Sequence, residues 1–168
     1  GYAYDGAQAS FELVARAELG LLPEFFEVKR YRVTVERRKN KYNQMVSLSE
    51  AVVVVKIGEA KMLSVSESMD ETGTDRGPVN ALAKALGKDL GPYQACIDDM
   101  KLVDFKVRIT QGGTEAVTRV IIDSEDSQGR RWSTVGVSAN IVDASFEALL
   151  DAINWKLIRD GGQPLRSA

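Results

Sequence analysis

The sequence predicts an α+β fold in which a short helix precedes two β-β-β-α repeats. Segments with strand-like alternation occur in two groups of three, and each group is followed by a segment with helical apolar spacing. The apolar stripe of the first helical segment, from Val79 to Leu90, recurs from Phe146 to Leu157 with the same spacings. Strand order and helix register therefore repeat together, which indicates an internal duplication.

The segment before the repeats predicts a helix over residues 4–19. Ala7, Phe11 and Val14 are spaced four and three apart and would form its apolar stripe. Gly20 follows at the position where a helix C-cap is expected.

The first repeat contains three predicted strands and a helix. Residues 25–38 alternate apolar and charged side chains, as a half-exposed strand does. Residues 49–58 include four consecutive valines, which favours a more deeply buried strand, and residues 61–69 supply the third. The helix carries the stripe of residues 79–90 and is expected to end at the Gly-Pro pair of residues 91–92.

The second repeat follows the same order. Strands are predicted over residues 101–110, 114–123 and 130–138, and the polar stretch SEDSQG forms the turn before the last of them. The final helix has alanines at positions that match those of the first helix: Ala148 and Ala152 correspond to Ala81 and Ala85.

These elements divide the chain into three parts, with residues 1–24 as a leading helical segment, residues 25–160 as the main domain and residues 161–168 as a tail. The two units of the domain are expected at about 25–91 and 100–160. A unit of roughly 60 residues has a marginal core, so we expect two packed units or a dimer. The chain begins without a methionine and is interpreted as a piece of a longer protein.

Composition argues against several classes of function. The net charge of −2 and the pI of about 5.3 provide no basic field for nucleic acid or for an anionic membrane. A run of about 18 apolar residues, which a membrane-spanning helix needs, does not occur. Histidine is absent, which removes the commonest general base and metal ligand. The single cysteine, Cys96, allows no internal disulfide and fits a reducing cytoplasm.

The stretch ETGTDRGPVNALAKAL, residues 71–86, places two glycines and a proline before the first repeat's helix. It lacks the Gly-Lys-Ser/Thr ending of a phosphate loop and the Gly-x-Gly-x-x-Gly spacing, so nucleotide binding is not predicted. Thr74 or Asp75 would cap the helix, and Pro78 suits its first turn. Two interpretations remain open: an ordinary helix entry, or a helix end whose backbone amides hold a carboxylate.

Neither a catalytic residue nor a metal site is predicted. The acidic pairs at 98–99 and 125–126 lie in predicted turns without calcium-loop spacing, so we interpret them as solvated. Cys96 has no histidine partner, which argues against a nucleophilic role. Trp132 and Trp155 are interpreted as core or interface residues.

Several motifs together resemble the C-terminal regulatory domain of the α-isopropylmalate synthase family. The resemblance covers residues 60–158, and its motifs occur in order at family-like separations: GPVNALAKAL, LVDFKVRI, GTEAVTRVIID and WSTVGVSANIVDASFEALLDAINWKL. The upstream segments GYAYDGAQASFELVARAELG and FFEVKRYRV resemble the citramalate synthase branch, in which such a segment links the catalytic part to the regulatory domain.

The resemblance implies a regulatory function. Full-length members condense acetyl-CoA with a 2-oxo acid, pyruvate in citramalate synthases, on a TIM barrel that uses a divalent metal. That barrel and its His-x-His motif are missing here, so this chain is expected to be inactive and to need no cofactor. The family's domain is a pair of β-β-β-α units that forms a homodimer. It binds isoleucine in citramalate synthases or leucine in isopropylmalate synthases, and binding inhibits the barrel.

The same resemblance implies an effector pocket, in which the start of the first repeat's helix would receive the effector's carboxylate. Neighbouring strands would form one apolar wall, because residues two apart on a strand share a face. Citramalate synthases can carry Tyr-Asp where this chain has Val-Asn, so the motif leaves the effector open between isoleucine and leucine. A constitutive dimerisation module without an effector is the third interpretation. The expected pocket residues are Val79, Asn80, Leu102, Phe105, Ile109, Ala116 and Thr118.

Overall fold

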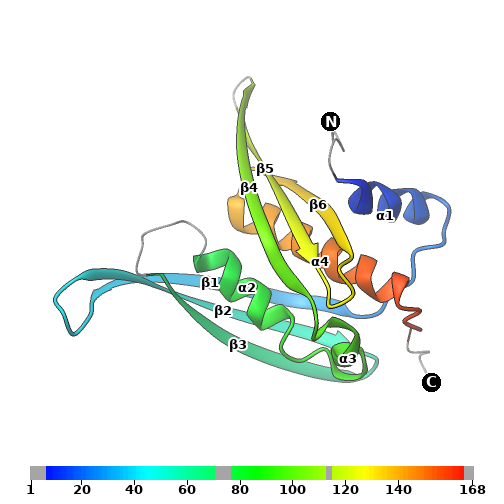
Figure 1. Cartoon of the computed structure of the whole chain (residues 1–168), viewed down its shortest axis with the longest axis horizontal. Helices are drawn as coiled ribbons and strands as arrows, with labels where there is room; N and C mark the ends of the chain where they lie inside the picture. The colour runs from blue at the N-terminus through cyan, green and yellow to red at the C-terminus, as the bar shows by residue number, and fades with distance from the viewer. Residues whose placement is uncertain (1–6, 71–76, 113–114, 165–168) are drawn as a thin grey trace. The chain divides into compact units, whose positions relative to one another are not determined.

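The computed structural model describes residues 7–70, 77–112 and 115–164, and it confirms the α+β class and the repeated β-β-β-α order (Figure 1). The chain divides into two compact units. One contains residues 25–94, and the other contains residues 95–163 together with the N-terminal helix. Each unit has a three-stranded antiparallel sheet in which the strands follow chain order.

The sheet of the 25–94 unit consists of β1 (Glu27–Lys39), β2 (Met45–Ile57) and β3 (Ala60–Asp70). The turn between β1 and β2 is closed by Asn40, whose side-chain oxygen accepts hydrogen bonds from the backbone N–H groups of Tyr42 and Gln44. Side-chain oxygens of asparagine stabilise turns in this way.

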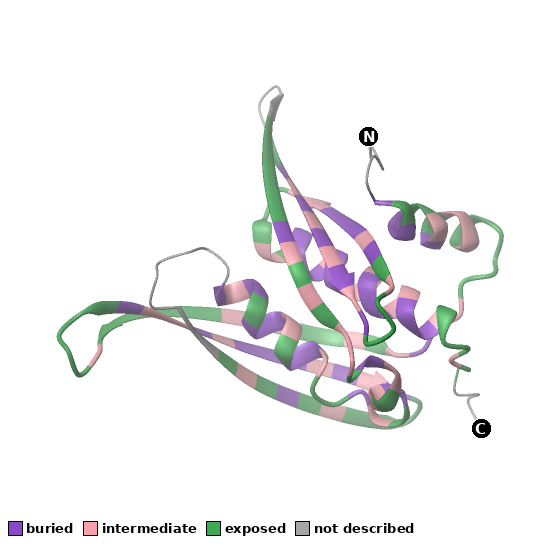
Figure 2. Ribbon diagram, viewed as in Figure 1, coloured by how far each residue is buried: buried purple, intermediate pink, exposed green. Residues whose placement is uncertain are grey.

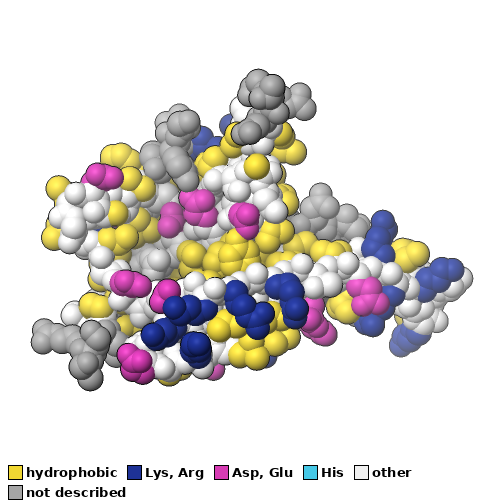
Figure 3. Space-filling model, turned by 180° about the vertical axis from the view of Figure 1, so that it is seen from behind, with side chains coloured by type: hydrophobic (Ala, Val, Ile, Leu, Met, Phe, Trp, Pro, Cys, Tyr) yellow, Lys and Arg dark blue, Asp and Glu magenta, His cyan; other side chains and the backbone are white. Residues whose placement is uncertain are grey.

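The helix of this unit, α2 (Gly77–Leu86), packs mainly on β2 and β3. The odd-numbered face of β2 forms the core, and its residues Ala51, Val53 and Val55 are almost fully buried (Figure 2). On the other face, the exposed side chains of Leu63 and Val65 lie on β3, two strands away from exposed arginines on β1. The view from behind in Figure 3 shows Lys and Arg side chains beside hydrophobic ones.

The end of α2 differs from the prediction, because the helix stops at Leu86 rather than at residues 91–92. The Gln94 side chain explains the earlier end: its amide donates to the Gly87 carbonyl at 2.6 Å and its oxygen accepts from the Leu90 N–H at 2.9 Å. Leu90 is nevertheless buried, as the stripe predicted. A single 3-10 turn (Gly91–Tyr93) and the short helix α3 (Gln94–Ile97) follow.

The sheet of the other unit consists of β4 (Lys101–Gly112), β5 (Glu115–Glu125) and β6 (Arg131–Ser138), and one of its faces is covered by α4 (Ile141–Arg159). Two β6 side chains bind α4 directly: the Thr134 hydroxyl donates to the Ala148 carbonyl at 2.7 Å, and the Trp132 indole donates to the Ala152 carbonyl at 3.1 Å. Asn140 caps the helix by accepting from the N–H of residue 142.

The N-terminal helix, α1 (Gln8–Glu18), packs against β6 and α4 (Figure 1). Of the predicted stripe only Ala7 is buried. Phe11 and Val14 are 57% and 41% exposed, and Ser10 and Leu13 are buried in their place. Gly20 has a φ of +67°, in agreement with its predicted role at the helix end. Among the residues described, none of the helices is long and apolar enough to cross a membrane.

Candidate effector site

Five of the seven predicted pocket residues lie on one face of the β4–β5 ladder. Ile109 is directly opposite Thr118. Ala116 lies two residues before Thr118 on β5, so its side chain is on the same face. Leu102 has the opposite parity from Phe105, yet a register shift between residues 102 and 104 turns it to the same side. These strands therefore form one continuous wall, which we call the β4–β5 wall and define as Leu102, Phe105, Ile109, Ala116 and Thr118.

Burial along the β4–β5 wall changes from one end to the other (Figure 2). Phe105 and Thr118 are only 9% and 7% exposed, and Thr118 belongs to β5, which α4 contacts. Ile109 is 65% exposed and Ala116 is exposed as well. Val107, on the same face as Ile109, is 37% exposed, so this end of the face presents neighbouring apolar side chains on which a small ligand or another protein chain can pack.

The other two predicted pocket residues, Val79 and Asn80, belong to the first turn of α2 in the 25–94 unit. Val79 is buried at 4% exposure, so its side chain is part of that unit's core, and Asn80 is exposed. The structure therefore brings together five of the seven residues within one unit. The predicted caps of α2, Thr74 and Asp75, lie outside the described residues.

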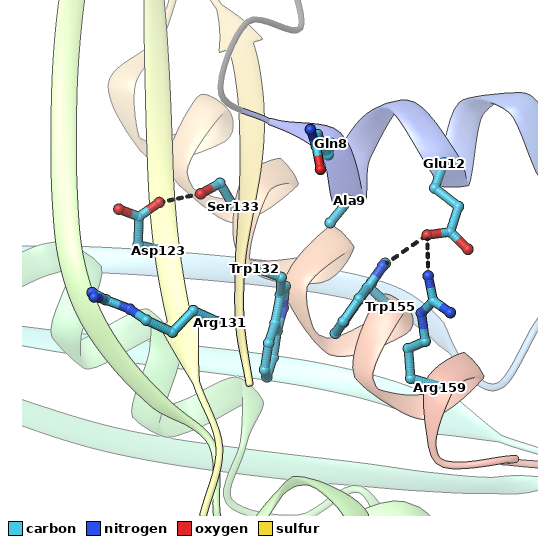
Figure 4. A pocket seen from close by; sticks show the side chains of 9 residues that line it. All are labelled: Gln8, Ala9, Glu12, Asp123, Arg131, Trp132, Ser133, Trp155 and Arg159. Carbon is cyan, nitrogen blue, oxygen red and sulfur yellow. Dashed lines mark hydrogen bonds and ion pairs between the residues drawn. The ribbon is translucent and has the colours of Figure 1, made fainter. Parts of the chain in front are cut away.

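A cavity of about 310 Å³ opens beside α1, at a place that sequence reasoning missed (Figure 4). Its walls come from α1, from β5 and β6, and from the C-terminal half of α4. The indole rings of Trp132 and Trp155 stack at 4.8 Å between centroids; Trp132 is a core residue, and Trp155 is partly buried against it, within the predicted core or interface role. The cavity is lined by Gln8, Ala9, Glu12, Asp123, Arg131, Trp132, Ser133, Trp155 and Arg159.

Polar contacts fasten α1 to the rest of this unit. The Ser10 hydroxyl accepts a hydrogen bond from the Val135 N–H at 2.9 Å and donates one to the Asp151 carboxylate on α4 at 2.8 Å. It therefore provides a hydrogen-bond partner for a backbone N–H on the outer edge of β6. Glu12 accepts from the Trp155 indole at 3.1 Å and from Arg159 at 2.9 Å (Figure 4). Sequence spacing gave no signal for these contacts, because the partners are more than 100 residues apart.

Asp151 makes the stability of this unit dependent on pH. Burial raises the pKa of its carboxyl from 3.8 to about 6; the hydrogen bond from Ser10 opposes this increase and the charge of Glu147 adds to it. A raised carboxyl pKa means that the folded state binds more protons than the unfolded state, so stability falls as pH rises from about 3.8 to about 6.

We therefore expect Asp151→Asn to stabilise the chain near neutral pH by about 1–3 kcal/mol and to change little at acidic pH. Urea unfolding of both variants across this pH range measures the difference. Parallel pH profiles for wild type and Asp151→Asn would show that the carboxylate is not destabilising.

A buried ionic cluster connects the other end of α4 to the β5–β6 turn. Lys156 is only 2% exposed, and its ammonium lies 3.0 Å from Asp126 and 2.7 Å from Asp160. Burial acts to raise the pKa of Asp126, but hydrogen bonds from Lys156 and Arg130 outweigh it and hold the pKa well below its usual range. Asp126, predicted to be a solvated turn residue, is in fact buried, because it pairs with a lysine of the helix.

These features define an α+β domain with two repeated units, a partly uncovered apolar wall and a docked N-terminal helix. The family model described as the LeuA allosteric (dimerisation) domain matches residues 5–157, and the chain belongs to this family. The resemblance seen in the motifs is thereby confirmed.

Relatives of known function share much of this chain. It is 43% identical over 159 residues to an (R)-citramalate synthase of Geobacter sulfurreducens, covering 94% of this chain and 28% of the relative. An (R)-citramalate synthase of Aquifex aeolicus is 37% identical over 163 residues, which cover 95% of this chain and 29% of the relative. A 2-isopropylmalate synthase of Methanocaldococcus jannaschii is 38% identical over 78 residues, which cover 46% of this chain and 14% of the relative. The chain thus spans less than a third of the length of these synthases.

Proposed function

We propose that this chain is the amino-acid-sensing part of a cytoplasmic citramalate synthase, an acyltransferase that condenses acetyl-CoA with pyruvate. It forms a homodimer, binds isoleucine and thereby inhibits a catalytic barrel elsewhere in the longer enzyme. The regulatory chain itself holds no catalytic residue and no cofactor, and the divalent metal belongs to the barrel. Support comes from the family match over residues 5–157 and from the citramalate synthases that are similar over most of the chain.

The observation that carries the proposal is the β4–β5 wall. Phe105, Ile109 and Thr118 share one face, and the wall becomes uncovered toward Ile109. A branched aliphatic side chain gains about 25 cal/mol for each square ångström of apolar surface that it removes from water. Isoleucine bound here would bury the exposed side chain of Ile109 against its own.

Inhibition requires that the effector bind one arrangement of the enzyme better than another. We assign the transmission to α1, because Ser10 and Glu12 fasten this helix to β6 and α4. A change in β5 or β6 on effector binding reaches α1 through these contacts, and α1 precedes both β-β-β-α repeats in the chain.

Leucine is the second candidate effector, since 2-isopropylmalate synthases are also similar to part of this chain. Moving one methyl group within an apolar pocket changes binding by only about 1–3 kcal/mol, so the shape of the wall decides between the two amino acids. A dimerisation module whose wall is covered by the second copy, without any effector, is the remaining alternative.

Ile109→Ala tests the site without disturbing the core. Since Ile109 is 65% exposed, we expect little loss of stability, whereas effector affinity should fall about 5- to 100-fold. Thr110→Ala is the matched control, because Thr110 is exposed on the opposite face of the same strand. The measurement is isoleucine inhibition of the full-length enzyme. Equal inhibition of the Ile109→Ala and Thr110→Ala enzymes would refute the assignment of the wall.

A further inference from the structure

The cavity beside α1 is distinct from the β4–β5 wall. Asp123 and Thr118 are an odd number of residues apart on β5, so they project from opposite faces of the sheet. The volume of about 310 Å³ lies at the lower end of the range for small-molecule sites, which is about 300–1,000 Å³. The cavity therefore suits a small metabolite rather than a nucleotide.

Several groups around this cavity are already engaged within the protein. The Glu12 carboxylate accepts from Trp155, Arg159 and Arg16. One face of the Trp155 ring stacks on Trp132, and the Arg159 guanidinium lies 5.1 Å from the centroid of the Trp155 ring. These groups form the wall on the α4 side and hold its shape.

Other groups around the cavity remain available, on β5 and β6 and at the start of α1 (Figure 4). The Arg131 side chain is exposed and makes no hydrogen bond or ion pair with any residue that the structure describes, and the same holds for the side chain of Gln8. Asp123 accepts a hydrogen bond from the Ser133 hydroxyl on one carboxylate oxygen, and its other oxygen has no partner among the described residues. Asp123 and Arg131 are diagonal neighbours on one sheet face, because Ser133 lies directly opposite Asp123.

We propose that this cavity binds a free α-amino acid. Arg131 binds the ligand's carboxylate through its planar guanidinium, which matches a carboxylate with two hydrogen bonds. Asp123 pairs with the ammonium group on the same carbon atom. The side chain of the ligand then extends over Ala9 and the edge of Trp132, the apolar part of the lining.

A ligand in this place contacts α1 as well as the sheet. Gln8 and Ala9 belong to α1, whereas Asp123 and Arg131 belong to β5 and β6. Because the ligand binds only when α1 is docked, an occupied cavity shifts the equilibrium toward the docked helix. A ligand in this cavity would thus act on α1, the helix to which the proposed function assigns the transmission of effector binding.

Tryptophan fluorescence tests the proposal directly, because the chain has two tryptophans and both line this cavity. The probes are L-leucine, its 2-oxo acid, which lacks the ammonium group, and leucinol, which lacks the carboxylate. L-leucine should change the emission saturably, and both analogues should bind at least about 10-fold more weakly, since a hydrogen bond to a charged group contributes about 1.5–3 kcal/mol.

Four variants separate this cavity from the β4–β5 wall. Arg131→Gln and Asp123→Asn should weaken the fluorescence-detected binding at least about 10-fold. Ile109→Ala and Arg108→Gln, the latter an exposed arginine on the same sheet face as Asp123, should leave it unchanged. The proposal is overturned if L-leucine at millimolar concentration does not change the emission, if Arg131→Gln and Asp123→Asn bind as wild type does, or if Ile109→Ala alone abolishes binding. The last result would assign the signal to the effector wall instead.

Discussion

Replacing Gly136 with alanine is expected to disrupt the packing of α4 on its sheet. A Cβ atom at Gly136 would lie 1.8 Å from the Ala144 carbonyl oxygen and 3.0 Å from the Ala148 backbone nitrogen. These are backbone atoms of α4, so the clash is relieved only by moving the whole helix away from β6. We expect a loss of about 3 kcal/mol or more, a large share of the roughly 5–15 kcal/mol that stabilises a typical domain.

Gly129→Ala provides the control for the Gly136 prediction. Gly129 lies in the same unit and has a φ of +76°, but apart from its chain neighbours no atom of the described residues lies within 4 Å of the position that an added methyl group would take. Alanine there should lose only about 1–2 kcal/mol through backbone strain. Urea unfolding followed by tryptophan fluorescence reports on this unit, since Trp132 and Trp155 both belong to it. Equal unfolding midpoints for the two variants would show that Gly136 is not a close-contact position.

Lys156→Met is expected to cause the second large loss of stability. The lysine is 2% exposed and is within 3.4 Å of three carboxylates, those of Asp99, Asp126 and Asp160. Methionine fills a similar volume but leaves these carboxylates without their shared cation. Breaking a buried ion pair on one side typically costs about 3–5 kcal/mol, and we expect about 2–3 kcal/mol because Arg130 remains as a partner.

The double variant Lys156→Met/Asp126→Asn distinguishes lost pairing from lost packing. Removing the negative charge that Lys156 neutralised should restore part of the stability, because an uncharged amide is less costly to bury than an unpaired carboxylate. Stability measured by urea unfolding at neutral pH gives the comparison. If the double variant loses as much stability as Lys156→Met and Asp126→Asn lose separately when added together, the two residues are not coupled, which would contradict the role assigned to this cluster.

The architecture was predictable because its signals are local and occur twice. Alternating side chains in β4 and the valine run in β2 reflect the period of a strand, and the stripes around Leu82 and Leu149 reflect the period of a helix. The repeat made each assignment support the other. The class and the repeated β-β-β-α order therefore followed from spacing, whereas the 3-10 turn and α3 between the repeats did not.

Details that depend on distant contacts were missed. The buried face of α1 contains the polar residue Ser10. Its burial is possible because its hydroxyl accepts a hydrogen bond from a backbone N–H of β6. The end of α2 is set by the side chain of Gln94, eight residues beyond Leu86. Lys156 is buried through partners that lie up to 57 residues away in the chain, Asp99 being the farthest. Apolar periodicity carries no information about such pairings.

The candidate site was predictable in part for the same reason. Parity correctly placed Phe105 and Ile109 on one face, and the register confirmed that Thr118 joins them. Leu102 came from the motif resemblance, and its agreement with this face depends on a bulge that alternation cannot reveal. The cavity beside α1 has no sequence signature, since its lining combines α1 with residues more than 100 positions later.

The most direct test of amino-acid sensing is thermal unfolding of wild type and Ile109→Ala with isoleucine, leucine, valine or no ligand, at several protein concentrations. A ligand that binds only the native state adds about 2.7 kcal/mol of stability at a hundredfold excess over Kd. We predict that isoleucine raises the melting temperature of wild type more than leucine or valine does, and that Ile109→Ala largely loses this preference for isoleucine while keeping any smaller, common response that the cavity beside α1 contributes. If the melting temperature depends on protein concentration but on none of the three amino acids, the chain is a dimerisation module without effector sensing.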